Sequence, residues 1–82
     1  MIEPNDNQCV LIESEVQFKQ YYHLMRSAIN GIEYDDWVRT YGLPEFPLYL
    51  GWAVHITNGR SLGIIDEPIN IWTKEELEII KL

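Results

Sequence analysis

Three side chains are of the types that carry nucleophilic or metal chemistry: Cys9, His23 and His55. A cysteine hydrolase needs a thiolate beside an imidazole and a carboxylate, and Cys with His can also hold zinc. No short spacing supports either arrangement. Cys9 lies in the apolar run QCVLIE, which is typical of an inert buried thiol, and His55 lies within a predicted strand. We therefore expect a non-enzyme without metal or cofactor, and the alternative is a small ligand-binding or enzymatic domain around His55 and Cys9.

Negative charge is the strongest chemical signal in the chain. The 82 residues have a net charge of −7, from 13 Asp and Glu against six Lys and Arg. Such a field repels nucleic-acid phosphates and anionic membranes and attracts basic proteins, although solubility alone is a sufficient reason for it. The carboxylates gather in residues 1–15, 33–45 and 66–78. These segments form one acidic patch if they share an edge of the molecule; otherwise each acid only stabilises its own helix start.

The candidate partner-binding site combines these acids with aromatic side chains. Aromatic residues often dominate the binding energy of protein interfaces, and charged rims speed encounter with a partner of opposite charge. The acidic candidates are Glu33, Asp35, Asp36, Glu45, Asp66, Glu67, Glu75 and Glu76, and the aromatic candidates are Tyr34, Trp37 and Tyr41. We predict a small acidic inhibitor that presents carboxylates to a basic, nucleic-acid-binding protein. Nuclease inhibitors, immunity proteins and phage-encoded anti-defence proteins share this physical character.

Two other interactions remain open. A homodimer or complex subunit would use an apolar face of the predicted hairpin, and Lys19, His23 and Arg26 form a small basic stripe that could touch nucleic acid. We nevertheless expect no direct nucleic-acid or membrane partner. No apolar run approaches the roughly 18–20 residues of a membrane span, and MIEPNDNQ has no secretory-signal pattern. A cytoplasmic location is therefore expected, which a single cysteine also fits.

Hydrophobic spacing predicts the first elements that position these residues. Residues 1–7 resemble a flexible tail and residues 8–82 a single domain. Residues 8–13 favour a strand, and Ser14 with Gln17 forms a capping box at the start of a helix that ends near Asn30-Gly31. Tyr34, Trp37, Val38 and Tyr41 then recur at helical spacing, which predicts a short helix with all four turned inward and Asp35 and Asp36 turned outward.

The second half of the chain predicts a hairpin and a final helix. Asn58-Gly59 favours a two-residue turn between strands 48–57 and 60–66, with Trp52 opposite Ile65. Both hairpin faces are apolar, so helices cover both or one is left for a partner. Residues 69–72 fit a brief strand, and Thr73 with Glu76 fits a capping box. The expected fold is α+β, in the order β-α-α-β-β-(β)-α, with the hairpin packed against helices.

Overall fold

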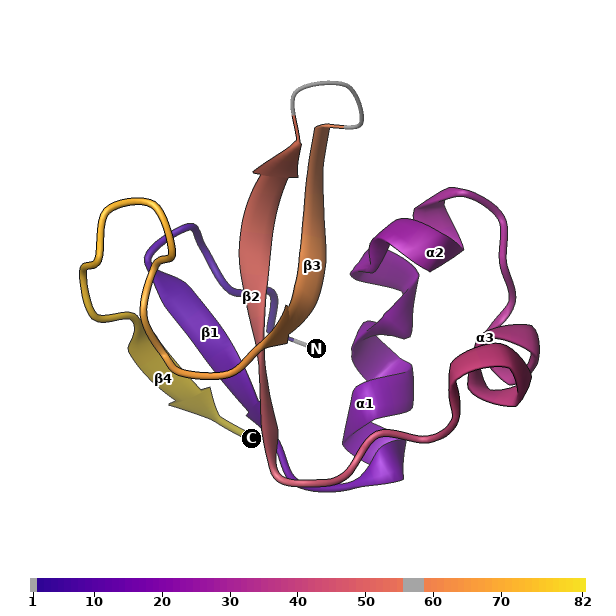
Figure 1. The fold of residues 1–82 in the computed structure, drawn as a ribbon. Coiled ribbons are helices and arrows are strands. Elements are labelled where there is room, and N and C mark those ends of the chain that lie inside the picture. Colours follow the sequence, from indigo (N-terminus) through magenta and orange to yellow (C-terminus); the bar gives the residue numbers. More distant parts are fainter. Residues whose placement is uncertain (1, 56–58) are drawn as a thin grey trace.

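The chain forms a small α+β domain, as predicted, with one sheet and helices on one of its faces (Figure 1). The computed structural model describes residues 2–55 and 59–82, and only the backbone at residues 53–55. The strands, in spatial order β3-β2-β1-β4, are β1 (Gln8–Ile12), β2 (Leu48–His55), β3 (Gly59–Ile65) and β4 (Glu78–Lys81). The helices are α1 (Glu15–Tyr21), the 3₁₀ turn η1 (Tyr22–Leu24), α2 (Arg26–Ile29) and α3 (Tyr34–Tyr41).

The predicted capping box at the start of α1 is confirmed in a slightly shifted form. The Ser14 hydroxyl accepts a hydrogen bond from the backbone N–H of Gln17 at 3.3 Å. The Gln17 side chain accepts in turn from the backbone N–H of Glu13 at 2.7 Å, one residue before the usual donor. Both bonds satisfy backbone donors that the helix itself leaves free, and they fix the turn from β1 into α1.

The long helix expected up to Asn30 is interrupted at Met25. This residue is extended, with ψ 153°, and separates η1 from α2. Its backbone forms a parallel bridge with Leu62 of β3, and its side chain is buried in the core. The break therefore covers part of the outer edge of β3, where unpaired strand groups would otherwise face solvent. Helical periodicity could not predict this, because the cause lies in the distant strand.

The hairpin forms, but the predicted register is wrong by three positions. Trp52 pairs with Leu62 instead of Ile65, and the last pair before the loop is His55 with Gly59. Residues 56–58 connect this pair and lie outside the described residues, so the predicted role of Asn58 in the turn does too. Gly59 has φ +72°, as a glycine at the end of a longer hairpin loop often does. The shift is an odd number of residues, and side chains alternate between the two faces of a strand. Residues of β2 and β3 that were predicted to share a face therefore lie on opposite faces of the sheet.

The final helix predicted from Thr73 is wrong. Residues 71–73 form a turn, and residues 78–81 form β4, which pairs in parallel with β1. The predicted strand over 69–72 is reduced to one bridge between Ile69 and Glu76. Without β4, β1 would be an edge strand with unpaired backbone groups, so pairing outweighs the local capping signal. The β-branched pair Ile79-Ile80 also favours a strand.

The core lies between the sheet and α1. Strand side chains from β1, β2 and β3 meet aromatic side chains of the helices there; the fully buried members are Val10, Ile12, Phe18, Tyr21, Leu50 and Leu62. No helix in the described residues is long and apolar enough to cross a bilayer. The stability of the domain rests mainly on the hydrophobic core between the sheet and α1, as expected for a domain of this size.

Residues 2–7, expected as a flexible tail, make tertiary contacts. The Tyr21 hydroxyl donates to the carbonyl of Ile2, and the Trp52 indole N–H donates to the carbonyl of Pro4 at 2.6 Å. Asp6 forms an ion pair with Arg60 at 2.6 Å. The Arg60 guanidinium also lies 3.7 Å from the centre of the Trp52 ring. The segment thus joins α1 to the β2–β3 hairpin.

Candidate partner-binding surfaces

Aromatic side chains attach α3 to the core. The ring centres of Phe18 and Trp37 are 5.5 Å apart, and those of Tyr22 and Tyr34 are 5.4 Å apart. Tyr34, Trp37 and Val38 are half-buried, so their predicted inward orientation is correct. Tyr41 was predicted to point inward as well, but 69% of its surface is exposed. Its ring centre lies 5.5 Å from that of Trp37, and the rest of the ring is open to solvent.

The carboxylates of α3 lie on its outer side, as predicted. Asp35 and Asp36 are exposed in the first turn, where the helix dipole favours negative charge. Glu33 and Glu45 are exposed just before and after the helix. Arg39 compensates part of this charge through an ion pair with Asp36 at 2.6 Å. Glu15 of α1, which belongs to the acidic segment 1–15, also lies beside α3, where it contacts Tyr34.

Tyr34 marks the point where those two acidic segments meet. Its hydroxyl donates to Glu15 at 3.3 Å. Burial raises the pKa of the Tyr34 hydroxyl, and the negative charges of Glu15 and Asp35 raise it further. Lys19 brings one positive charge to the same place, with its Nζ 5.3 Å from the centre of the Tyr34 ring. We call Glu15, Asp35, Asp36, Tyr34 and Tyr41 the α3 surface.

The third acidic segment does not join the α3 surface. Asp66, Glu67, Glu75 and Glu76 are exposed in the connection from β3 to β4. Figure 1 places this connection on the side of the sheet away from α1–α3. Asp66, Glu67, Glu75 and Glu76 are therefore separate from the carboxylates near α3, and these two groups do not form one continuous patch.

An open groove lies beside this third segment, and sequence reasoning did not find it. Its volume is about 470 Å³, and it is lined by Gly51, Gly63, Ile64, Ile65, Asp66, Glu67, Ile69, Ile71 and Lys74. Its floor is the cross-strand pair of Gly51 and Gly63. A Cβ on Gly63 would meet nothing within 4 Å, whereas one on Gly51 would lie 2.9 Å from Ile65. Two glycines inside predicted strands were the available signal, but the register error hid their pairing.

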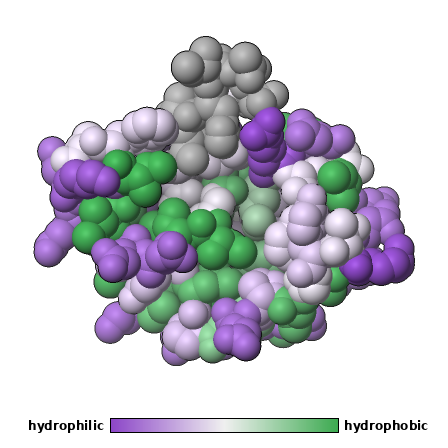
Figure 2. Space-filling model, in the orientation of Figure 1, coloured by the Kyte–Doolittle hydropathy of each residue, from purple (hydrophilic) through white to green (hydrophobic). Residues whose placement is uncertain are grey.

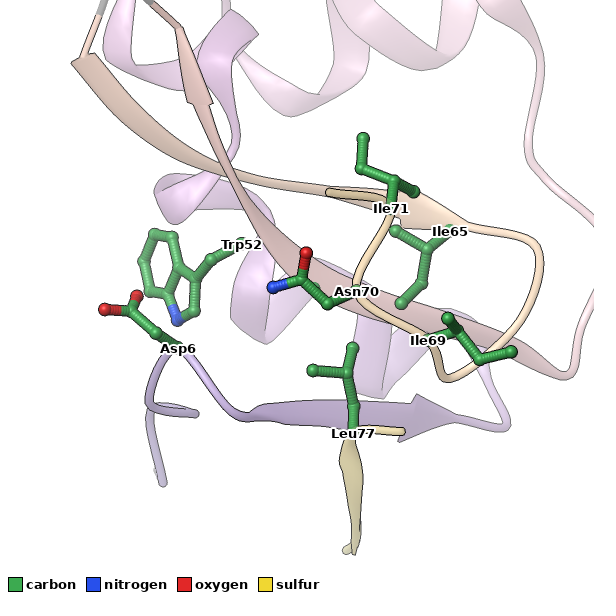
Figure 3. A pocket seen from close by; sticks show the side chains of 8 residues that line it. Asp6, Trp52, Ile65, Ile69, Asn70, Ile71 and Leu77 are labelled. Atoms are coloured by element: carbon green, nitrogen blue, oxygen red, sulfur yellow. The ribbon is translucent and has the colours of Figure 1, made fainter. Parts of the chain in front are cut away.

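The surroundings of the groove are apolar. Figure 2 shows hydrophobic surface gathered on the side where Figure 1 shows the β3–β4 connection, broken by hydrophilic side chains. In Figure 3, Ile65 and Leu77 extend toward the backbone of residues 69–71. The cavity that remains between them holds only about 30 Å³. The connection is thus packed on the sheet, while the adjoining groove stays open.

Cys9, one of the residues considered for catalysis, lies in an environment that suits an unreactive thiol. Cys9 is fully buried, and burial raises the pKa of its thiol, which disfavours the reactive thiolate. The side chain of His55 lies outside the described residues. Among the residues that the structure describes, no group of three or more His, Cys, Asp or Glu could hold a metal ion. His23 and Arg26 are exposed, but the break at Met25 separates them into different helical turns.

Comparison of the chain with protein-family models, with curated proteins and with solved structures gives no match.

Proposed function

We propose that the protein is a small non-enzymatic inhibitor that uses its α3 surface to bind a basic protein. The target class that fits this charge is a nucleic-acid-binding enzyme or nucleoprotein complex, as for anti-defence proteins, nuclease inhibitors and immunity proteins. The observation that carries the proposal is the arrangement of α3: it has exposed carboxylates in its first turn and an exposed Tyr41 ring at its last residue, on a helix fixed to the core by aromatic contacts.

Rigid attachment supports this use of the surface. Binding costs less conformational entropy when the contacting side chains are already held in place. Trp37 holds Tyr41 through ring contact, and Tyr34 holds Glu15 through a hydrogen bond. Carboxylates around an aromatic contact suit a surface of Lys and Arg, since the charges guide encounter and the ring supplies buried area.

Affinity capture followed by calorimetry on the captured protein tests the proposal. We expect a basic target whose affinity falls as salt increases, and whose binding to its own nucleic acid is reduced by the protein. Asp35→Lys with Asp36→Lys should weaken target binding by at least about tenfold, as loss of close charge pairs does at other interfaces. The matched control is Glu75→Lys with Glu76→Lys, which makes the same charge change on the other side of the sheet.

Three results would contradict the proposal: an acidic target, binding that salt does not weaken, or equal losses from the two charge-reversed variants. Equal losses would mean that overall charge, and not the α3 surface, drives association. The alternative enzyme is tested separately. Cys9→Ser and His55→Ala should leave target binding and inhibition unchanged.

A further inference from the structure

The groove over Gly51 and Gly63 lies on the side of the sheet away from the α3 surface, so it is separate from the surface proposed to bind a basic protein. We propose that the protein forms a two-fold dimer in which the groove of each copy receives the Trp72 side chain of the other. This dimer does not depend on the function proposed for α3.

Trp72 is presented at the tip of an ordered turn. It is 72% exposed, although it follows directly on Ile71, which lines the groove. The Asn70 side chain accepts hydrogen bonds from the backbone N–H groups of Trp72 and Thr73, at 2.8 and 3.1 Å. Thr73 accepts from the N–H of Glu75, and the backbones of Asn70 and Glu75 are also bonded. These four bonds order the backbone of the turn that carries Trp72, which lowers the entropic cost of presenting its ring to a partner.

The groove is suited to an aromatic side chain. Its volume of about 470 Å³ lies within the roughly 300–1,000 Å³ of small-molecule pockets. Four isoleucines line it, and Ile64 and Ile71 are themselves exposed. The open space above Gly63 allows a ring to approach the strand backbone closely. Burial of Trp72 there would also cover the exposed Ile71 side chain, which favours association.

The charges on the rim are complementary between two copies. Asp66 and Glu67 line the groove together with Lys74, and all three side chains are exposed. Within the described residues, none of the three takes part in an ion pair. In a two-fold contact each surface meets its own copy, so Lys74 of one copy can approach Asp66 or Glu67 of the other. The turn that carries Trp72 lies next to the groove. One two-fold axis can therefore place the Trp72 of each copy in the groove of the other.

Analytical ultracentrifugation of the full chain, from low to high micromolar concentration, tests the dimer. We expect a concentration-dependent dimer whose dissociation constant rises at least about tenfold in Trp72→Ala, the usual effect of removing a central interface Trp. Gly63→Leu should have the same effect, because a Cβ there meets nothing within 4 Å and the rest of the side chain would occupy the groove. Circular dichroism verifies folding, and if Gly63→Leu does not fold, Trp72→Ala decides alone.

An equimolar mixture tests the reciprocal exchange. Trp72→Ala keeps the groove and Gly63→Leu keeps the tryptophan, so the mixture restores one of the two contacts. We expect a heterodimer weaker than the wild-type dimer but tighter than either variant by itself. Ile71→Asp should also weaken the dimer, whereas Ile29→Asp should not. These isoleucines are a matched pair, since each is 58% exposed and Ile29 lies on α2.

Salt separates this contact from the one proposed for α3. Each copy has a net charge of −7, and this repulsion outweighs the weak attraction of Lys74 to Asp66 or Glu67, because exposed ion pairs contribute little. Added salt should therefore tighten the dimer while it weakens binding to a basic target. A wild-type monomer at all concentrations would overturn the dimer, as would a dimer that survives in Trp72→Ala. Capture of a different protein that requires Trp72 and an open groove, with the free chain monomeric, would also overturn it in favour of that partner.

Discussion

The two faces of the sheet are covered in different ways. On one face, α1 packs against the sheet, and its side chains Phe18 and Tyr21 are completely buried. On the other, the connection between β3 and β4 contains no helix and leaves Ile71 and Trp72 exposed. The first face has the aromatic volume that stabilises a small domain. The second has apolar area and a groove that the chain itself does not fill, and it is where we propose that a second copy binds.

The largest expected difference between the faces is in stability. Phe18→Ala should lower the free energy of unfolding by about 3–5 kcal/mol, because it removes a fully buried ring from the centre of the core. Ile71→Ala should change it by less than about 0.5 kcal/mol, as substitutions at exposed sites usually do. Urea denaturation at low protein concentration, where the chain is monomeric, measures both. Similar losses would show that the β3–β4 connection contributes as much to stability as the core.

Alkaline pH should act on the helix face. Burial raises the pKa of Tyr21, Tyr22 and Tyr34 above the usual value for a tyrosine. The unfolded chain then loses these protons more readily than the folded one, so their contribution is complete below about pH 10 and is lost as the pH rises through the raised values. We expect the urea midpoint to fall above about pH 10.

Tyr22→Phe sharpens this pH test. The variant loses a hydrogen bond to the carbonyl of Ile32, at 2.8 Å, so its stability at neutral pH should be slightly lower. Its decline above pH 10 should be shallower than that of the wild type, because one buried hydroxyl no longer ionises. Tyr41→Phe, at an exposed ring, is the control for hydroxyl loss. An unchanged slope in Tyr22→Phe would mean that the alkaline loss comes from elsewhere in the molecule.

What the sequence could predict follows the same division between the faces. Local signals succeeded on the helix side: the Ser14 cap, the α3 spacing and the outward Asp35 and Asp36 all depend on residues within one or two turns. Prediction failed where distant segments compete. Met25 leaves its helix to bridge Leu62, and residues 78–81 pair with β1 although Thr73 and Glu76 favour a helix start.

The candidate site divides in the same way. Asp35, Asp36, Tyr34 and Trp37 are placed correctly by helical spacing, because the helix that carries them is local. The separation of Asp66, Glu67, Glu75 and Glu76 from them depends on β4, where a helix was predicted from the capping signal of Thr73 and Glu76. The groove depends on the hairpin register as well, because only the pairing of Gly51 with Gly63 brings two residues without side chains together.

The smallest expected effects come from that glycine pair, and they test the groove without any partner. Gly51→Ala should lower the free energy of unfolding by about 1 kcal/mol, since its Cβ would lie 2.9 Å from the terminal carbon of Ile65, which must move. Gly63→Ala should raise it by about 0.5 kcal/mol, because alanine loses less entropy in a strand and its Cβ meets open space. The two substitutions are chemically identical and lie opposite each other in the sheet. Opposite signs in urea denaturation would therefore show that the space above Gly63 is open and that above Gly51 is not. A loss at Gly63 as large as that at Gly51 would mean that Ile71 closes over the groove in the free protein, and Trp72 of a second copy would then have no place to bind.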